Sequence, residues 1–124
     1  MRRDPDLLRD ILLTIEAAPG AELLRLPRFE DHAPNVIRAH VRLLIEAGLV
    51  HAVRGPGRID QEWFALGLSW RGYDYLDTVR DPAIWRLTKM AAAKVGNWSF
   101  ETLGTIARAV ALAKVQSLGL ALAS

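Results

Sequence analysis

Two arginines and an asparagine share one stripe of residues 34–47, where the spacing of apolar residues predicts a helix. At about 100° per residue, Asn35, Arg38 and Arg42 point away from the apolar side of this helix. Arginine suits bidentate hydrogen bonds to guanine and asparagine suits adenine, and each such pair discriminates by about 1–3 kcal/mol. The pattern favours a DNA-reading face. It also fits an ordinary solvated face, and Glu46 on the same stripe would repel a phosphate.

A second candidate for phosphate contact is the loop Arg54-Gly55-Pro56-Gly57-Arg58. Its glycines and proline exclude a helix and predict a tight loop tip. From such a tip Arg54 and Arg58 could straddle a phosphate, and the glycines would let backbone amides approach it. Asp60 and Glu62 partly cancel this charge, so a turn with solubilising charges is the alternative.

The first residues offer a basic arm, because Arg2 and Arg3 could follow a nucleic-acid backbone. Asp4, Asp6 and Asp10 follow directly, so the arm is not cleanly positive. The whole chain carries 16 Lys and Arg against 14 Asp and Glu, a net charge of +2, and residues 1–62 alone sum to −1. General charge attraction is therefore weak, and DNA binding would depend on the local geometry of the helix and the loop.

The titratable residues do not assemble into recognisable catalytic or metal chemistry. The chain has no Cys, which excludes a disulfide framework, a thiolate zinc site and a thiol nucleophile. His32 and His40 have no carboxylate in a ligand pattern between them, and His40 fits a hydrogen-bonded histidine that packs its helix. No Ser-His-acid arrangement, glycine-rich phosphate loop or paired-carboxylate motif occurs in the sequence. We expect no enzyme activity, no metal and no cofactor.

Aromatic side chains could stack on nucleic-acid bases, but here they stand beside apolar neighbours in predicted strands and helices. We expect these residues to serve the core and the packing of helices instead. The set comprises Trp63, Trp70, Tyr73, Tyr75, Trp85 and Trp98.

Start and stop signals divide the chain into helices and strands. Asp4-Pro5 is typical of a helix start, Pro19-Gly20 of a stop, and Gly48 of a left-handed stop after the helix at 34–47. The predicted helices cover residues 5–18, 34–47, 70–80, 82–95 and 100–118, and the predicted strands lie within 21–28, 49–53 and 63–68.

A helix that ends in Glu-Ala-Gly-Leu-Val and runs at once into a β-hairpin is the outline of a winged helix-turn-helix domain. We expect an α+β, mostly helical fold with a winged helix-turn-helix-like core in residues 1–80. A C-terminal two-helix extension in residues 81–124 would pack on this core or mediate dimerisation. Only fourteen residues separate Pro19 from Pro34, which leaves little room for the positioning helix of a standard winged helix.

Three stretches carry a family resemblance: MRRDPDLLRDILL at the start, HVRLLIEAGLV in the middle, and LSWRGYDYLD followed by Arg80-Asp81 and Ile84-Trp85. Together they resemble an uncharacterised domain-of-unknown-function family of short bacterial and prophage-encoded proteins, over about residues 1–110. The resemblance implies a winged-helix-like core with an added helical tail. It implies no established activity, so no catalytic or binding residues are carried over.

The last predicted helix is apolar nearly all round, and such a helix must be covered on more than one side. One side could pack on the first helix and the winged part, and the other side on a second copy or another protein. The expected interface residues are Ile106, Leu112 and Val115. The alternative is an alanine-rich tail over the core, or a frayed end.

These patterns favour a small DNA-binding protein that acts as a phage or bacterial transcriptional regulator. The exposed side chains of the helix at 34–47 would contact bases, and the loop arginines would contact the DNA backbone. The alternative is a protein-interaction module on a winged-helix scaffold, such as a phage-encoded inhibitor or adaptor, that does not bind DNA. Double-stranded DNA, a protein partner and a second copy in a homodimer are the expected partners. The sequence contains no run of eighteen apolar residues and no cleavable apolar signal. We therefore expect a cytoplasmic protein without membrane contact.

Overall fold

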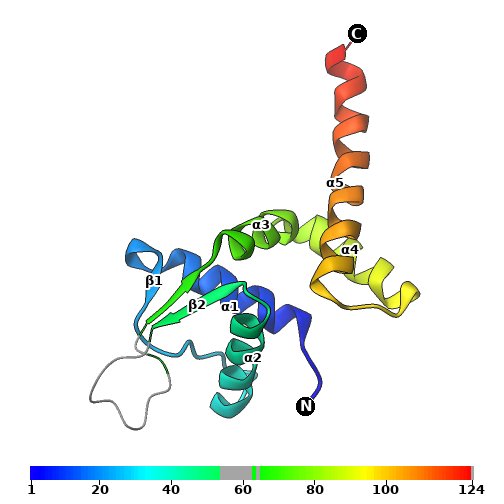
Figure 1. Ribbon diagram of the computed structural model, residues 1–124. Coiled ribbons are helices and arrows are strands. Elements are labelled where there is room, and N and C mark those ends of the chain that lie inside the picture. Colours follow the sequence, from blue (N-terminus) through cyan, green and yellow to red (C-terminus); the bar gives the residue numbers. More distant parts are fainter. Residues whose placement is uncertain (54–62, 64, 124) are drawn as a thin grey trace. The chain divides into compact units, whose positions relative to one another are not determined.

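The computed structural model describes residues 1–53, 63 and 65–123, and the side chains as far as residue 119 (Figure 1). In this described part the chain is a mostly helical α+β protein with five α-helices and one small antiparallel sheet. It forms two compact units, Met1–Leu76, called unit 1, and Asp77–Ser124, called unit 2. The predicted fold class is thus confirmed at the level of a mostly helical α+β protein.

Unit 1 begins with a helix and ends within another, with the sheet between them. Every helix and strand predicted for this part of the sequence is present, although the first strand is only two residues long. The elements are α1 (Pro5–Ala17), the 3-10 turn η1 (Pro19–Ala21), β1 (Glu22–Leu23), α2 (Pro34–Glu46), β2 (Val50–Val53), β3 (Ala65–Leu68) and α3 (Trp70–Val79), which runs across the boundary between the units.

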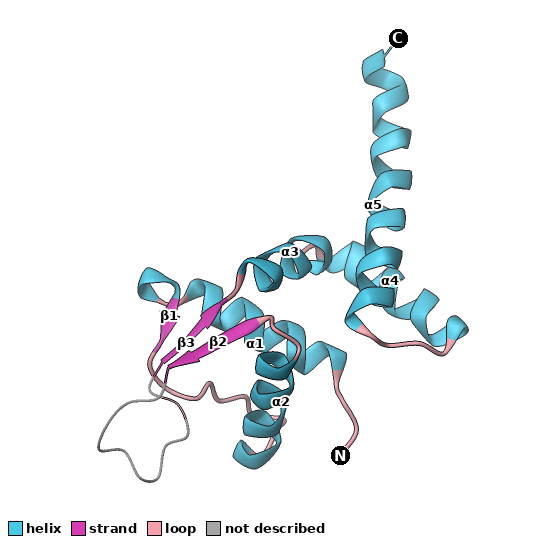
Figure 2. Cartoon of the chain, in the orientation of Figure 1, coloured by secondary structure: helices cyan, strands magenta, loops and turns pink. Residues whose placement is uncertain are grey.

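The sheet of unit 1 has the strand order β1-β3-β2, and both pairings are antiparallel (Figure 2). Strand β3 is central because Leu66 pairs with Leu23 on one side and with Ala52 on the other. Helix α1 packs against β3, and α2 packs against both α1 and β2. The core between these elements is aliphatic and consists mainly of Leu8, Ile11, Leu12, Ile15, Ile37, Val41, Leu44, Val50, Leu66 and Leu68.

The end of α2 is built by the left-handed glycine that the sequence predicts. Gly48 has φ 76°, and its N–H donates to the carbonyl of Ile45 at 3.0 Å. The N–H of Leu49 donates to the carbonyl of Leu44 at 2.9 Å, which completes a Schellman motif. Leu49 is buried, so the chain turns inward here and enters β2 directly.

The start of α3 is fastened to this same turn. The Ser69 hydroxyl accepts the N–H of Gly72 at 2.9 Å and donates to the carbonyl of Gly48. The N–H of Ser69 donates to the carbonyl of Leu49 at 3.0 Å. Gly72 is buried, and its backbone lies directly against that of Leu49. The turn after α2 and the first turn of α3 therefore form one packed junction.

Unit 2 contains a pair of helices, α4 (Pro82–Val95) and α5 (Phe100–Ala123). Asp81 caps α4 as predicted, and its carboxylate accepts the N–H groups of Ala83 and Ile84 at 2.8 and 3.0 Å. The two helices pack together through a buried set made of Trp85, Thr88, Ala92, Leu103 and Ala107. Helix α5 continues five residues beyond the predicted end at 118, because alanine and leucine favour the helix there.

The aromatic residues only partly follow the expectation that they fill the core. Trp85 and Tyr75 are buried as predicted, and burial raises the pKa of the Tyr75 phenol. Trp70 is 83% exposed, so its predicted core role is wrong. The reason is helical phase: the buried residues of α3 cluster around Leu76 and Val79, and Trp70 lies on the opposite side of the helix.

Candidate nucleic-acid interface

Helix α2 separates its side chains into a buried and an exposed face. Ile37, His40, Val41 and Leu44 are buried against α1 and the sheet. Asn35, Arg38 and Arg42 are all exposed, and Glu46 joins them at the end of the same stripe. The structure thus brings the three base-reading candidates on α2 together on one surface. The other two, Arg54 and Arg58, lie outside the described residues.

The middle and the end of helix α2 are fixed by contacts with other elements, whereas its first turn has no capping side chain. Residues 24–33, which precede it, contain no helix, and the N-cap residue Ala33 makes no side-chain capping bond. The amides of Val36 and Ile37 donate to the backbone carbonyl of Ala33 at 3.0 and 3.1 Å. The exposed stripe is therefore oriented by the packing of α2 on α1 and by the turn at Gly48.

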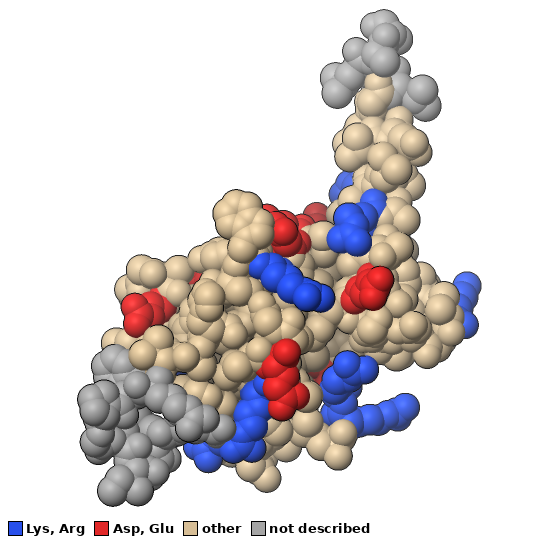
Figure 3. All heavy atoms as spheres, viewed as in Figure 1, with Lys and Arg blue, Asp and Glu red and all other residues tan. Residues whose placement is uncertain are grey.

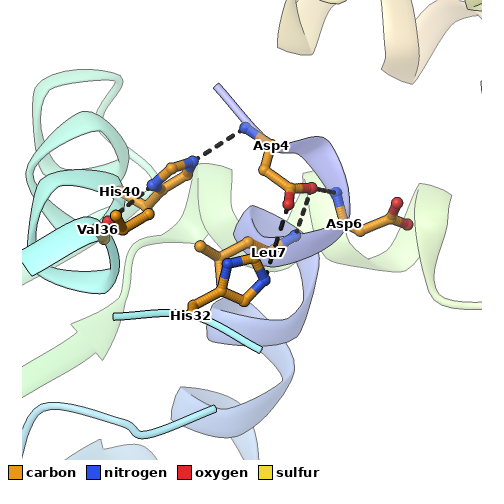
Figure 4. A network of polar contacts seen from close by, with 6 residues as sticks. All are labelled: Asp4, Asp6, Leu7, His32, Val36 and His40. Atoms are coloured by element: carbon orange, nitrogen blue, oxygen red, sulfur yellow. Dashed lines mark hydrogen bonds and ion pairs between the residues drawn. The ribbon is translucent and has the colours of Figure 1, made fainter. Parts of the chain in front are cut away.

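A polar cluster ties the start of α1 to the middle of α2 (Figure 4). His40 is only 1% exposed, and its Nε2 accepts the backbone N–H of Asp4 at 2.9 Å. Its Nδ1 lies 2.8 Å from the carbonyl oxygen of Val36 and donates to it. Both bonds require the neutral imidazole with its hydrogen on Nδ1. The prediction that His40 is a hydrogen-bonded packing histidine is confirmed.

Asp4 has two further roles in this cluster. Its Oδ1 accepts the N–H groups of Asp6 and Leu7 at 3.0 and 3.2 Å, which caps α1 as the sequence predicts. Its Oδ2 lies 3.8 Å from Nε2 of His32, in the segment that leads to α2. The Asp4 carboxylate is thus engaged by the helix start and by a histidine, and its backbone fixes the chain against α2 (Figure 4).

The link between Asp4 and His40 is the feature of this surface that the sequence interpretation missed. The two residues are 36 positions apart, and no local pattern joins them. The only signals were indirect, a capping Asp-Pro pair and a histidine on the inner edge of an amphipathic helix. In space, the link places Arg2 and Arg3 next to α2. Figure 3 shows Lys and Arg side chains over α2 and over the N-terminal segment on one face, with an acidic side chain between them.

The start of α1 also carries a carboxylate whose titration is perturbed. Burial raises the pKa of Asp10 above its ordinary value, and the carboxylates of Asp6 and Asp4 act in the same direction. Arg9, whose Nη1 lies 4.0 Å from Oδ1 of Asp10, opposes the shift. The surface near the N-terminal arginines is therefore mixed in charge rather than uniformly basic.

The interface residues predicted on α5 do not share one face. Leu112 and Val115 are 57% and 60% exposed, and Leu118 beside them is 61% exposed. Ile106 is half-buried and adjoins the buried Ala107 in sequence. The structure therefore brings Leu112 and Val115 together on an uncovered stripe, and it places Ile106 elsewhere.

The described residues also bear on metal binding and on membrane insertion. Among them, no group of three or more His, Asp or Glu side chains is placed to hold a metal ion. None of the helices in that part of the chain is both long and apolar enough to cross a membrane.

Comparison with known proteins agrees with the resemblance seen in the sequence. Residues 2–97 match a family described as hypothetical protein (DUF2513). A protein of Haemophilus influenzae, named "Uncharacterized protein", is 32% identical over 90 residues, which cover 72% of this chain and 76% of that protein. No solved structure is significantly similar to the chain. With most of its length matched by the family, and unit 1 wholly within that match apart from Met1, the chain belongs to the DUF2513 family.

Proposed function

We propose that unit 1 is a winged-helix domain that binds double-stranded DNA, with α2 as the helix that enters the major groove. The observation that carries the proposal is the placement of α2, which buries one face against α1 and β2 and exposes Asn35, Arg38 and Arg42 on the other. A regulator of transcription in a phage or bacterium is the role that fits such a domain best.

The topology of unit 1 supports this reading. A winged helix pairs its first strand with its third, and the order β1-β3-β2 agrees with that pairing, although unit 1 has the single helix α2 between β1 and β2. The hairpin strands β2 and β3 follow α2 directly. A helix that is followed directly by a hairpin suits recognition of bases by the helix and of phosphates by the hairpin.

The charge of unit 1 limits how this binding could work. Unit 1 contains ten Lys and Arg against eleven Asp and Glu, so its net charge is −1. Long-range attraction to DNA is therefore small, and affinity must come from local contacts by cations such as Arg38. Each phosphate neutralised by a cation contributes about 0.9 to the slope of log K against log salt concentration.

Fluorescence anisotropy with a labelled duplex of roughly two helical turns tests the proposal at two salt concentrations of about 50 and 200 mM. We expect salt-dependent binding by the natural chain and weaker binding by Arg38→Ala/Arg42→Ala. Arg86→Ala/Lys94→Ala, which removes two exposed cations from α4, serves as the charge-matched control and should bind as the natural chain does. No salt-dependent binding to any duplex, or equal losses in both double variants, would overturn the proposal.

A second candidate function is association through α5, and the exposed Leu112, Val115 and Leu118 favour it. Covering the exposed part of each side chain contributes about 1–2 kcal/mol. Three such side chains from each of two copies contribute about 6–12 kcal/mol in total, against an association cost of about 4–15 kcal/mol. The two terms are of similar size, so any homodimer formed through this stripe alone is weak. A protein-interaction module that does not bind DNA would use the same stripe for another partner.

Sedimentation velocity over a range of protein concentrations tests the homodimer. Leu112→Asp/Val115→Asp should be monomeric at concentrations where the natural chain dimerises. Ala113→Asp/Ser117→Asp adds the same two charges to another exposed side of α5 and should leave the dimer intact. A natural chain that stays monomeric at every concentration would contradict self-association.

A further inference from the structure

The hydrogen bond between the backbone of Asp4 and His40 determines where the first residues of the chain can go. It fixes residue 4 against the middle of α2, with a distance of 2.9 Å between the amide nitrogen and Nε2. Consecutive Cα atoms are about 3.8 Å apart, so the Cα atoms of Arg3 and Arg2 lie within about 4 and 8 Å of Asp4. Both arginines are therefore confined to the neighbourhood of α2.

Arg2 and Arg3 keep their charges available at this position. Both are exposed, and neither forms an ion pair within the described part of the chain. The nearest carboxylate in sequence, Asp4, is engaged by the amides of Asp6 and Leu7 and faces His32. The bonds of Asp4 therefore direct its carboxylate at the first turn of α1 and at His32 rather than into an ion pair with either arginine.

We propose that Arg2 and Arg3 bind backbone phosphates of double-stranded DNA beside α2, and that the Asp4–His40 hydrogen bond positions them. This inference rests on the proposed DNA-binding function of unit 1 and adds a second contact region to it. The major groove is about 12 Å wide, so a helix lying in it has the phosphates of its rims within reach of two arginines tethered alongside. Figure 3 shows cations over α2 and over the N-terminal segment on one face, with an acidic side chain between them, so the two arginines form a second contact region separate from the stripe on α2.

The test compares salt slopes, because loss of phosphate contacts has a defined signature. We expect Arg2→Ala/Arg3→Ala to lower the slope by about 1.8 relative to the natural chain. The ratio of the natural chain's binding constant to that of the variant should therefore fall by about twelvefold when the salt concentration rises from 50 to 200 mM. The Arg86→Ala/Lys94→Ala control should keep the slope of the natural chain. The probe is the same labelled duplex.

The outcomes separate this inference from the proposed function. If Arg2→Ala/Arg3→Ala keeps the natural slope while Arg38→Ala/Arg42→Ala weakens binding, the arm is rejected and the DNA-binding domain stands. If the natural chain does not bind the duplex, both fall together. If the control lowers the slope as much as the arm variant does, the effect is general charge and the arm is rejected.

The positioning role of His40 has its own measurement. His40→Leu removes the acceptor of the Asp4 amide and leaves both arginines in the chain, so the salt slope should fall toward that of Arg2→Ala/Arg3→Ala. Circular dichroism at the assay temperature verifies that the variant is folded. A folded His40→Leu protein with the natural slope would overturn the positioning, and Arg2→Ala/Arg3→Ala tests the phosphate contacts whether or not this variant folds.

Discussion

The contact between α3 and the turn after α2 leaves no room for a side chain at position 72. A Cβ atom added to Gly72 would overlap the carbonyl oxygen of Leu49 and lie 3.1 Å from its carbonyl carbon. Leu49 cannot retreat easily, because its N–H is bonded to Leu44 and its carbonyl accepts the N–H of Ser69 at 3.0 Å. The substitution Gly72→Ala should therefore force backbone against backbone.

The net effect of Gly72→Ala is the difference of two opposing terms. Alanine is favoured over glycine in a helix interior by about 1 kcal/mol. Overpacking costs about 1–3 kcal/mol and sometimes more, and a clash between two fixed backbones belongs at the upper end of that range. We expect the free energy of unfolding of unit 1 to fall by about 2 kcal/mol. For a unit of this size, that corresponds to a fall in Tm of about 8–16 °C.

Thermal unfolding of the full chain, followed by far-ultraviolet circular dichroism, measures this effect. Gly119→Ala is the matched control, because a Cβ atom there meets nothing within 4 Å, and this variant should be at least as stable as the natural chain. A Gly72→Ala protein with an unchanged or raised Tm would refute the reasoning, because it would show that α3 does not lie against Leu49.

Substitutions at three further positions test the contacts around α1, α2 and α3. His40→Leu leaves the Asp4 amide without its acceptor and should lower the free energy of unfolding by about 1–3 kcal/mol in urea titrations, with a smaller loss for His40→Gln, whose amide can both accept and donate. Ser69→Ala removes a cap bonded on both sides and should cost about 1–2 kcal/mol; a loss indistinguishable from zero would contradict the cap. Asp10→Asn tests the dependence of stability on pH. Because the pKa of Asp10 is raised in the folded state, the natural chain loses stability as the pH rises above the ordinary pKa near 3.8. The variant should therefore be more stable than the natural chain at neutral pH and equally stable at acid pH. The gain should be about a few tenths of a kcal/mol because the carboxyl is half exposed, and a variant less stable at neutral pH would show that Arg9 dominates.

Local chemistry made the element boundaries predictable. Asp4 before Pro5 and Asp81 before Pro82 cap their helices by accepting backbone amides, which depends only on neighbouring residues. Gly48 ends α2 because glycine adopts positive φ without strain. The exposed stripe on α2 follows from helical periodicity in the same way, so this part of the candidate site could be read from the sequence.

Contacts between distant residues could not be predicted in that way. The Asp4–His40 hydrogen bond depends on how α1 crosses α2, which no local pattern specifies. Trp70 is a different case, because its residue type favours burial whereas its helical phase favours exposure. Large apolar residues are usually buried, yet the phase of α3 set by Leu76 and Val79 places Trp70 toward solvent. Periodicity was the stronger signal there.

The absence of a helix in residues 24–33 changes how α2 would have to be held against DNA. In helix-turn-helix proteins the helix before the reading helix crosses the backbone and contributes to its positioning. Here α2 is held instead by His40, which bonds the start of α1, and by the turn at Gly48, which is fastened to α3 through Ser69. Both supports lie on the buried side or at the end of α2 and leave its outward stripe uncovered. In the DNA-binding function proposed above, the phosphate contacts that a preceding helix would make come from other elements flanking α2, and we propose Arg2 and Arg3 for this role.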